Sequence, residues 1–224
     1  MPKKSFKQTY LTRQNLYFFI SGIFILLSFF AFTLWVRANH LESFDFDTTV
    51  RIQNITPLRL DSFFSFLSVI GRFEFTTPAL FIVLLLWSKF KPKRIIAVFL
   101  VMGMLAFAHV LEIVGKSILE HPGPPNMFLR SQFSEFPGLH VHTQASYPSG
   151  HAMRIIFLGV IYLYISFKSR LPLILKLGAY FFLAGTTAAM LYSRVSLGEH
   201  WTTDVIGGAI LGLSMALLSL IILI

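Results

Sequence analysis

The sequence has no cysteine, and this absence excludes disulfide bonds and thiol chemistry from any account of the protein. Charged residues are also scarce, at 13% of the chain, whereas soluble domains carry about 25%. Hydrophobic residues make up 55% of the chain and include 25 phenylalanines. This composition excludes an ordinary soluble domain and is typical of a membrane protein. The chain also lacks internal repeats and low-complexity tracts.

The apolar residues fall into six blocks, each long enough to cross a membrane. About 20 helical residues at about 1.5 Å per residue cover the ~30 Å hydrocarbon core of a bilayer. The second block is interrupted near Gly71, which predicts an interfacial helix over Leu60–Ile70 and a span that begins at Phe75. We therefore predict an all-α fold, a polytopic bundle of six transmembrane helices. The blocks are Tyr17–Val36, Phe63–Trp87, Ile95–Leu119, His151–Phe167, Leu171–Tyr192 and Trp201–Ile224.

The domain organisation follows from the same blocks. The first block is too long, and the residues after it are too charged, for a cleavable signal peptide, so we expect it to remain as an anchor. The stretches between the blocks are too short for a second, soluble domain. Residues 1–224 are expected to form one integral-membrane domain.

Positive charge is distributed unevenly along a chain with a net charge of +9. It gathers before the first block and in the Lys89–Arg94 and Lys168–Arg170 loops, and all ten acidic residues lie outside these segments. By the positive-inside rule, these segments and both termini face the cytoplasm. The charge then indicates contact with the anionic surface of a lipid bilayer and not with nucleic acid. Three segments are predicted on the outer face: Arg37–Leu60, His121–Gly150 and Ser193–His200.

The first outer segment is polar and leads into an amphipathic stretch. Such a stretch is expected to lie in the membrane interface with its apolar face in the bilayer. We favour this interpretation over a catalytic role for Asp45 or Asp47. The residues expected to share the apolar face are Leu60, Phe63, Phe64 and Leu67.

Two short motifs place polar groups at the ends of apolar blocks. Pro148-Ser149-Gly150-His151 precedes an apolar run, so Ser149 is predicted to cap a helix whose first amides point outward. Such a helix start binds anions, phosphate above all. His200 and Asp204 are one helical turn apart, so the carboxylate can accept the imidazole N–H, fix its tautomer and raise its basicity. Taken alone, this pair could equally tie two helices together.

The polar groups of the last four blocks form one set. Two cations, a helix start, two histidines and a carboxylate suit a phosphoryl group: the cations and amides neutralise its oxygens, one histidine attacks, and the other protonates the leaving oxygen. A single carboxylate beside Lys and Arg predicts no metal site, and no cofactor is expected. The predicted active site lies at the outer-face ends of spans three to six. Its members are Lys116, Ser149, His151, Arg194, His200 and Asp204.

These residues, in this order, resemble the type 2 phosphatidic-acid phosphatase superfamily, which includes lipid phosphate phosphatases and vanadium haloperoxidases. Its signatures are K-x6-R-P, P-S-G-H and S-R-x5-H-x3-D. The second is complete at Pro148–His151 and the third at Ser193–Asp204, and the motif-bearing core covers about residues 95–224. The resemblance implies that His200 forms a phosphohistidine, that Asp204 orients it, and that His151 is the general acid. It also implies a phosphate site made by Lys116, Arg194, Ser149 and the Gly150 amide.

The function implied is a metal-independent lipid phosphatase. It would hydrolyse a phosphomonoester or diphosphate of a membrane lipid at the outer face of a bacterial plasma membrane. The alternative is a catalytically impaired member of the family that binds or transports phospholipid. A phosphotransferase that uses the same phosphohistidine is a third possibility. Oligomeric state and the particular lipid are left open.

The first signature is incomplete, because Gly123 stands where the family has an arginine before Pro124. An arginine holds phosphate through two parallel hydrogen bonds, so its loss weakens phosphate binding. Three residues could replace it: Arg154, Arg130 and His121. We prefer Arg154, one turn after His151, as a phosphate-binding residue; an ion pair of Arg154 with Glu112 or Glu120 is equally compatible with the sequence.

Overall fold

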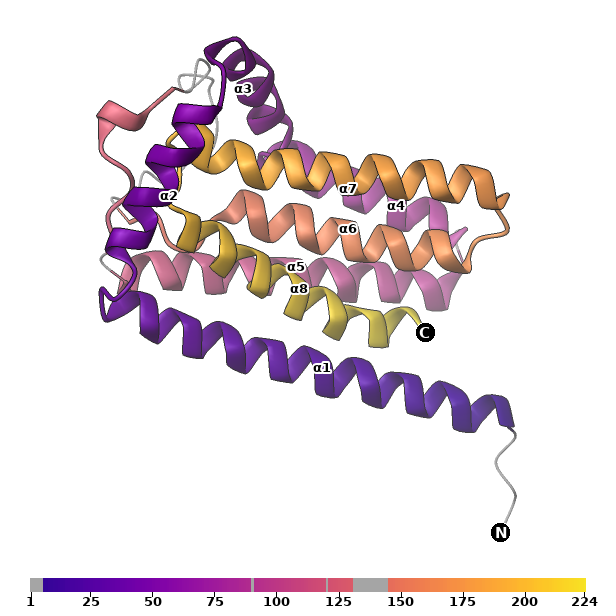
Figure 1. Cartoon of the computed structure of the whole chain (residues 1–224). Helices are drawn as coiled ribbons and strands as arrows, with labels where there is room; N and C mark the ends of the chain where they lie inside the picture. The colour runs from indigo at the N-terminus through magenta and orange to yellow at the C-terminus, as the bar shows by residue number, and fades with distance from the viewer. Residues whose placement is uncertain (1–5, 90, 120, 131–144) are drawn as a thin grey trace.

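The computed structural model describes residues 6–89, 91–119, 121–130 and 145–224. Within these ranges the chain is built from α-helices and two single-turn 3-10 helices, without a β-strand (Figure 1). The predicted all-α fold is therefore confirmed. The helices are α1 (Phe6–Arg37), α2 (Glu42–Ile55), η1 (Leu58–Leu60), α3 (Asp61–Ile70), α4 (Phe73–Ser88), α5 (Pro92–Ile118), η2 (Asn126–Phe128), α6 (Gly150–Lys168), α7 (Leu173–Ser196) and α8 (Thr202–Leu223).

Five of these helices are long and apolar enough to cross a membrane: α1, α5, α6, α7 and α8. A sixth crossing would use the segment Leu58–Ile70 together with α4, two pieces that are bent by 56° relative to each other. The predicted break near Gly71 is thus confirmed, and it divides the second block into α3 and α4. The described residues thus hold five candidate spans, or six if this bent pair forms one broken span.

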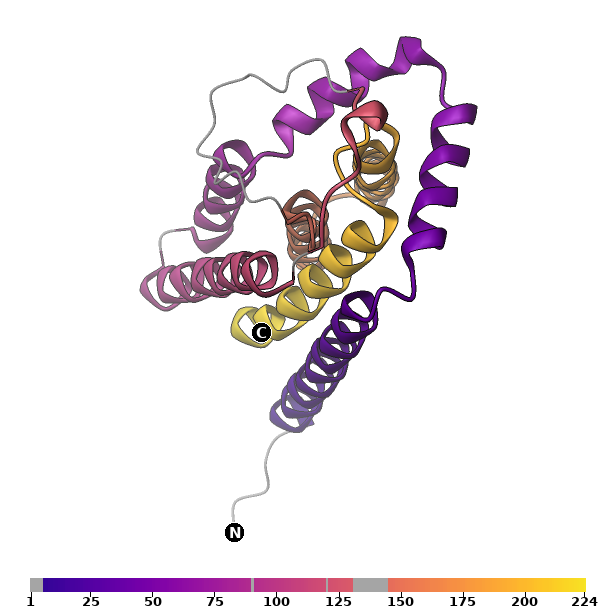
Figure 2. The same ribbon diagram turned by 90° about the vertical axis from the view of Figure 1, so that its left-hand side faces the viewer.

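Helix α8 lies in the middle of the bundle and packs against α1, α5 and α6 (Figure 2). Its contact with α6 is close because α8 presents glycines there. A Cβ atom at Gly208 would lie 2.2 Å from the Ser149 carbonyl oxygen, and one at Gly212 would lie 2.2 Å from the Met153 carbonyl oxygen. Small residues are the usual means by which transmembrane helices approach closely. The starts of α6 and α8, which carry the motif residues, are consequently held side by side.

The core of the bundle is apolar and is shared by α1, α4, α5, α6 and α8. Leu105, Phe157 and Met215 are fully or almost fully buried in it. Large apolar side chains also cover the outside of α7, where Phe181 is 85% exposed and Phe182 is 74% exposed. Such a surface is unfavourable in water and expected in lipid.

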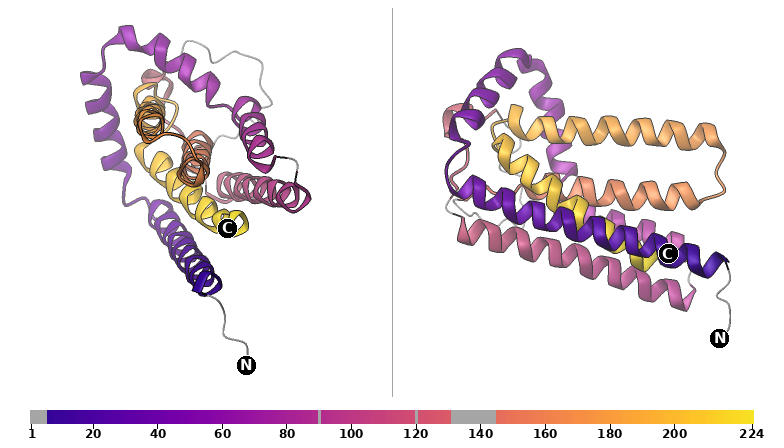
Figure 3. Two further views of the ribbon diagram at one scale, coloured as in Figure 1. Left: turned by 90° about the vertical axis from the view of Figure 1, so that its right-hand side faces the viewer. Right: turned by 60° about the horizontal axis from the view of Figure 1, so that its bottom comes forward.

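The two ends of the bundle differ in character. The starts of α1, α5 and α7 and the ends of α4, α6 and α8 lie together at one end (Figures 1 and 3). This end carries the basic Lys89–Arg94 and Lys168–Arg170 loops, whereas Lys3 and Lys4 lie outside the described residues. We call the opposite end, which carries α2, α3 and η2, the site end, because all the motif residues lie there.

Helices α2 and α3 turn polar faces towards the bundle. The buried residues of α2 are Asp45, Thr49 and Gln53, and those of α3 are Asp61, Phe64, Ser65, Leu67 and Ser68. The prediction that Leu60, Phe63, Phe64 and Leu67 share one membrane-facing apolar face is therefore wrong for Phe64 and Leu67, which are buried, whereas Phe63 is 54% exposed. Ser65 and Ser68 are buried beside Phe64 and Leu67, whereas Phe63 and Phe66 are exposed, where the membrane interface can accept them.

Candidate active site

His200 and Asp204 lie at the start of α8, and a third residue joins them. His200 Nδ1 is 3.3 Å from Asp204 Oδ2 and 2.9 Å from the Ser146 hydroxyl oxygen. The Ser146 hydroxyl donates to Asp204 Oδ2 at 2.5 Å. Asp204 Oδ2 also accepts the Trp201 backbone N–H at 2.9 Å, so this carboxylate caps its own helix. The predicted His–Asp pair is confirmed, with Ser146 as a bridge between its members.

These contacts fix the tautomer of His200. The hydroxyl proton of Ser146 is used by Asp204, so the Ser146 oxygen accepts from His200 and Nδ1 carries the imidazole proton. Both hydrogen bonds between the ring and described residues are made by Nδ1. Nε2, with its free electron pair, is the nitrogen available for substrate.

The start of α6 has the predicted geometry. The Ser149 hydroxyl accepts from the Ala152 backbone N–H at 3.5 Å, a long N-cap bond, and Gly150 is the first residue of the helix. The Ser149 N–H donates to the Asp204 carbonyl oxygen at 2.9 Å. A Cβ atom at Gly150 would lie 2.2 Å from Glu112 Oε1, so the Glu112 carboxylate lies directly against this glycine. A negatively charged group therefore already lies at the helix start that was predicted to bind phosphate.

His151 follows directly and faces α3. Its Nε2 lies 3.1 Å from the Ser68 carbonyl oxygen, which only accepts hydrogen bonds, so Nε2 carries a proton. His151 also interacts electrostatically with Arg194, Arg154 and His200. The structure thus brings together residues of both complete motifs.

Arg194 is fully buried in the last turn of α7, two residues beyond the predicted end of that span at Tyr192. Its guanidinium donates to the Ser68 hydroxyl oxygen at 2.6 Å and to the Ser193 hydroxyl oxygen at 3.0 Å. It also forms an ion pair with Glu199, the residue before His200. A buried guanidinium needs such partners, because an unpaired charge in a protein interior is very costly.

Lys116 and Arg154 share the carboxylate of Glu112. Lys116 Nζ lies 2.8 Å from Glu112 Oε1, and Arg154 Nη1 lies 3.8 Å from Glu112 Oε2. Arg154 also donates to the Gly71 carbonyl oxygen at 3.3 Å. The structure therefore contains the ion pair that the sequence left open for Arg154, with Glu112 as the partner. Glu120, the other suggested partner, lies outside the described residues.

The other two candidates for the missing arginine lie elsewhere. The Arg130 guanidinium donates to the Thr56 carbonyl oxygen at 3.4 Å, at the end of α2. His121 lies beside Asp204, with 3.5 Å between Nε2 and Oδ1. Gly123 itself lies next to Ser146: a Cβ atom there would be 3.5 Å from the Ser146 Cβ, an ordinary contact. Only Arg154 lies among the predicted phosphate-binding residues.

Helix α2 supports the site from outside the bundle. Asp45, 2% exposed, accepts hydrogen bonds from the Thr203 backbone N–H at 2.9 Å and from its hydroxyl at 2.5 Å. Burial raises the pKa of Asp45, and the two bonds from Thr203 act in the opposite direction. The interfacial role suggested for this segment is therefore wrong for Asp45, because the carboxylate is a helix cap for α8 supplied by α2.

Sequence reasoning missed three further residues of the site. Glu199 could have been noticed, because a carboxylate directly precedes the predicted nucleophile. Ser146 and Ser68 carry no such signal, since they reach the site through the tertiary fold. Among the described residues, no group of three or more His, Asp or Glu side chains is arranged to hold a metal ion.

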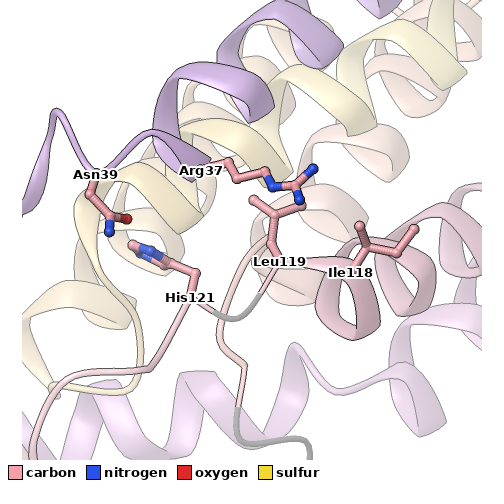
Figure 4. Close-up of a pocket in the computed structure, with 5 residues that line it drawn as sticks. All are labelled: Arg37, Asn39, Ile118, Leu119 and His121. Carbon is pink, nitrogen blue, oxygen red and sulfur yellow. The ribbon is translucent and has the colours of Figure 1, made fainter.

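A pocket of about 380 Å³ opens beside the site, between the ends of α1 and α5 (Figure 4). It is lined by Arg37, Asn39, Ile118, Leu119 and His121. His121 thus borders both the pocket and Asp204.

Comparisons with known proteins identify the family of this chain. The model of the PAP2 superfamily matches residues 97–223. An undecaprenyl-diphosphatase of Sulfolobus acidocaldarius is 29% identical over 212 residues, which cover 92% of this chain and 91% of the relative.

Two solved structures share the fold. A transmembrane PAP2-type phosphatidylglycerolphosphate phosphatase of Bacillus subtilis superposes with a TM-score of 0.68 at 23% identity, over 89% of this chain and 93% of that one. Aquifex aeolicus LpxE superposes with a TM-score of 0.57 at 22% identity, over 79% of this chain and 94% of that one. These matches confirm the predicted family resemblance and the predicted class of enzyme, a phosphoric-ester hydrolase. Since the family model matches more than half of the chain and includes every predicted site residue, the chain belongs to the PAP2 superfamily.

Proposed function

We propose that the protein is a metal-independent lipid phosphatase that works through a phosphohistidine on His200. The observation that carries this proposal is the tautomer of His200. Its proton is held at Nδ1 by Ser146 and Asp204, so the electron pair of Nε2 is free for attack on phosphorus. An imidazole oriented in this way by a carboxylate is a competent nucleophile at neutral pH.

The first chemical step forms one bond and breaks another. His200 Nε2 attacks phosphorus, and the bond between phosphorus and the lipid oxygen breaks. The leaving oxygen takes the Nε2 proton of His151, which in this structure is donated to the Ser68 carbonyl oxygen. In the second step a water attacks phosphorus and gives a proton to His151. The bond to His200 breaks, and inorganic phosphate is released.

The phosphate group needs positive partners, and three described cations near the start of α6 are candidates for this role. Each of these cations forms an ion pair with a carboxylate in this structure. Arg194 pairs with Glu199, and both Lys116 and Arg154 pair with Glu112. A phosphoryl group would take the place of these carboxylates and would also meet Ser149 and the Gly150 amide. Equatorial charge in the transition state would then be neutralised by guanidinium and ammonium groups.

A membrane lipid is the substrate class that fits best. The site lies at one end of a bundle whose helices carry apolar surfaces, so a lipid headgroup would reach it without leaving the membrane. The named relatives support a lipid monophosphate or diphosphate, since one is an undecaprenyl-diphosphatase and another a phosphatidylglycerolphosphate phosphatase.

The outer membrane face is the proposed location of the site. The basic Lys89–Arg94 and Lys168–Arg170 loops lie at the opposite end of the bundle, and short basic loops remain on the cytoplasmic side. Both chain ends would accordingly be cytoplasmic.

A second candidate function is phospholipid binding or transport without turnover. Gly123 in place of the arginine favours it, as do the carboxylates that neutralise the phosphate-binding cations. Phosphate release in detergent, with EDTA present and a panel of lipid mono- and diphosphates, separates the two. Release that resists EDTA, is inhibited by vanadate and disappears in His200→Ala supports the phosphatase. Binding of the same lipids without release supports the second function.

A further inference from the structure

The two carboxylate oxygens of Asp204 differ in their hydrogen bonds. Its Oδ2 atom accepts from Ser146 at 2.5 Å and from the Trp201 N–H at 2.9 Å, and lies 3.3 Å from His200 Nδ1. Its Oδ1 atom is buried and has no hydrogen bond to a described residue. A buried carboxylate oxygen in this state lacks the partner that its charge requires.

The polar atom that faces Oδ1 is His121 Nε2, at 3.5 Å. This nitrogen is itself buried and has no hydrogen bond to any described residue. Each atom thus lacks a hydrogen bond that the other could provide. A small rotation of the imidazole would let Nε2–H donate to Oδ1. Asp204 would then lie between two histidines, His200 on one oxygen and His121 on the other.

The position of His121 is fixed by its surroundings. Its carbonyl oxygen accepts the Ser146 backbone N–H at 2.8 Å, and its ring packs edge-on against Tyr147, with 6.3 Å between ring centroids. Tyr147 is fully buried and its hydroxyl is hydrogen-bonded to Thr33 at 2.9 Å. The segment that brings Ser146 to His200 therefore also brings His121 to Asp204.

We infer that His121 is a positioning residue for the catalytic pair, which rests on the proposed role of His200 as nucleophile. His121 holds Oδ1, so that Oδ2 stays directed at Ser146 and His200 Nδ1. It acts through Asp204 and does not touch the phosphoryl group. This role differs from replacement of the absent arginine, in which His121 would bind phosphate itself.

The pocket gives this inference an unusual test. His121 separates Asp204 from an open pocket of about 380 Å³, so His121→Ala would connect the two. Free imidazole could enter through the pocket and take the place of the lost ring. Restoration of kcat by added imidazole would require a group that acts locally on Asp204, and a merely structural role for His121 would not produce it.

The experiment compares three variants in the full-length protein in detergent. His121→Phe keeps a ring without a donor, His121→Gln keeps a donor, and His121→Ala is assayed with and without imidazole. His40→Ala is the matched control, because His40 is exposed at the turn between α1 and α2. We expect kcat to fall about 10- to 100-fold in His121→Phe and His121→Ala, with KM and the vanadate inhibition constant unchanged. His121→Gln should retain more activity than His121→Phe, and imidazole should raise kcat only in His121→Ala.

Three results would overturn the inference. The first is a kcat of His121→Phe within twofold of the wild type. The second is a rise in the vanadate inhibition constant large enough to account for the loss of activity. The third is a folded, impaired His121→Ala whose kcat does not change when imidazole is added. If His121→Ala does not fold, the comparison of the Phe and Gln variants decides. His200→Ala is assayed in parallel. If His200→Ala keeps turnover, the proposed function itself has failed. If His200→Ala is inactive and His121→Phe has normal activity, only the positioning role is rejected.

Discussion

The guanidinium of Arg194 is bound to the carboxylate of Glu199, the residue directly before the proposed nucleophile His200. The proposed mechanism places the substrate phosphate on this same arginine, so it predicts competition between phosphate and Glu199. In Glu199→Gln the arginine loses its counter-charge, and an anion in the site should restore it. We expect vanadate to inhibit this variant at a concentration about tenfold lower than in the wild type, which corresponds to about 1.4 kcal/mol.

Thermal unfolding gives an independent measure of the same competition. Glu199→Gln should unfold at a lower temperature than the wild type and gain more stability from added vanadate. Exposed Glu42, at the start of α2, offers a control in Glu42→Gln, which should change neither quantity. Unchanged or weaker vanadate inhibition in Glu199→Gln would show that Glu199 does not compete with phosphate.

Ser146 is predicted to be necessary for the orientation of His200. Without its hydroxyl, His200 Nδ1 keeps only the 3.3 Å contact with Asp204. We expect Ser146→Ala to lower kcat about 10- to 100-fold with little change in KM, as is typical when a group that orients a reactive residue is removed. Ser117→Ala, at an exposed serine of α5, should be without effect. A Ser146→Ala variant with normal kcat would mean that Asp204 suffices to orient the ring.

Arg154 is predicted to take part in phosphate binding in place of the missing arginine. Arg154→Ala should reduce activity about as severely as Arg194→Ala, since each removes a guanidinium from the phosphate site. Steady-state phosphate release measures both. An Arg154→Ala variant within a few-fold of the wild type would assign Arg154 to the ion pair with Glu112 alone.

An arginine at Gly123 offers the complementary test. The space there admits a Cβ atom, which would contact Ser146 at an ordinary distance. We expect Gly123→Arg to recover part of the activity lost in Arg154→Ala, because it restores a guanidinium at the family's position. Equal activity of the single and double variants would argue against any exchange of roles between these positions.

Asp45 is predicted to make stability depend on pH. Burial raises its pKa in the folded protein, so its protonated form is favoured by folding. Its contribution to stability is fully present below the unfolded-state pKa and is lost as the pH rises through the folded-state value. Asp45→Asn cannot titrate, so its stability relative to the wild type should increase across that range. Thermal unfolding of the two proteins from about pH 4 to 7 measures the difference, and a constant difference would contradict the shift.

Much of this architecture is predictable because it depends on local sequence. The apolar blocks located the spans, Gly71 located the break between α3 and α4, and Ser149 marked the start of α6. The long third motif located His200 and Asp204 on one turn of α8. Each of these features depends on a stretch of about 25 consecutive residues or fewer, which is the length of one span.

The residues that sequence reasoning missed depend on contacts between distant segments. Ser68 meets Arg194 and His151 only because α3 folds back over the site end of the bundle. Asp45 caps α8 from α2, 158 residues away in sequence. A signal for α2 did exist, since Asp45, Thr49 and Gln53 recur every fourth residue and form its buried polar face. That period was not distinguished from the polar face of an interfacial helix.

The most direct test of the central claim is chemical identification of the phosphoenzyme. Wild-type protein is mixed with a lipid phosphate carrying a labelled phosphoryl group, quenched in alkali within the first turnover, and digested for mass spectrometry. The proposed mechanism predicts an acid-labile, alkali-stable phosphate on His200, formed with EDTA present and absent from His200→Ala. Turnover without a phosphoenzyme, or label on a different residue, would contradict it.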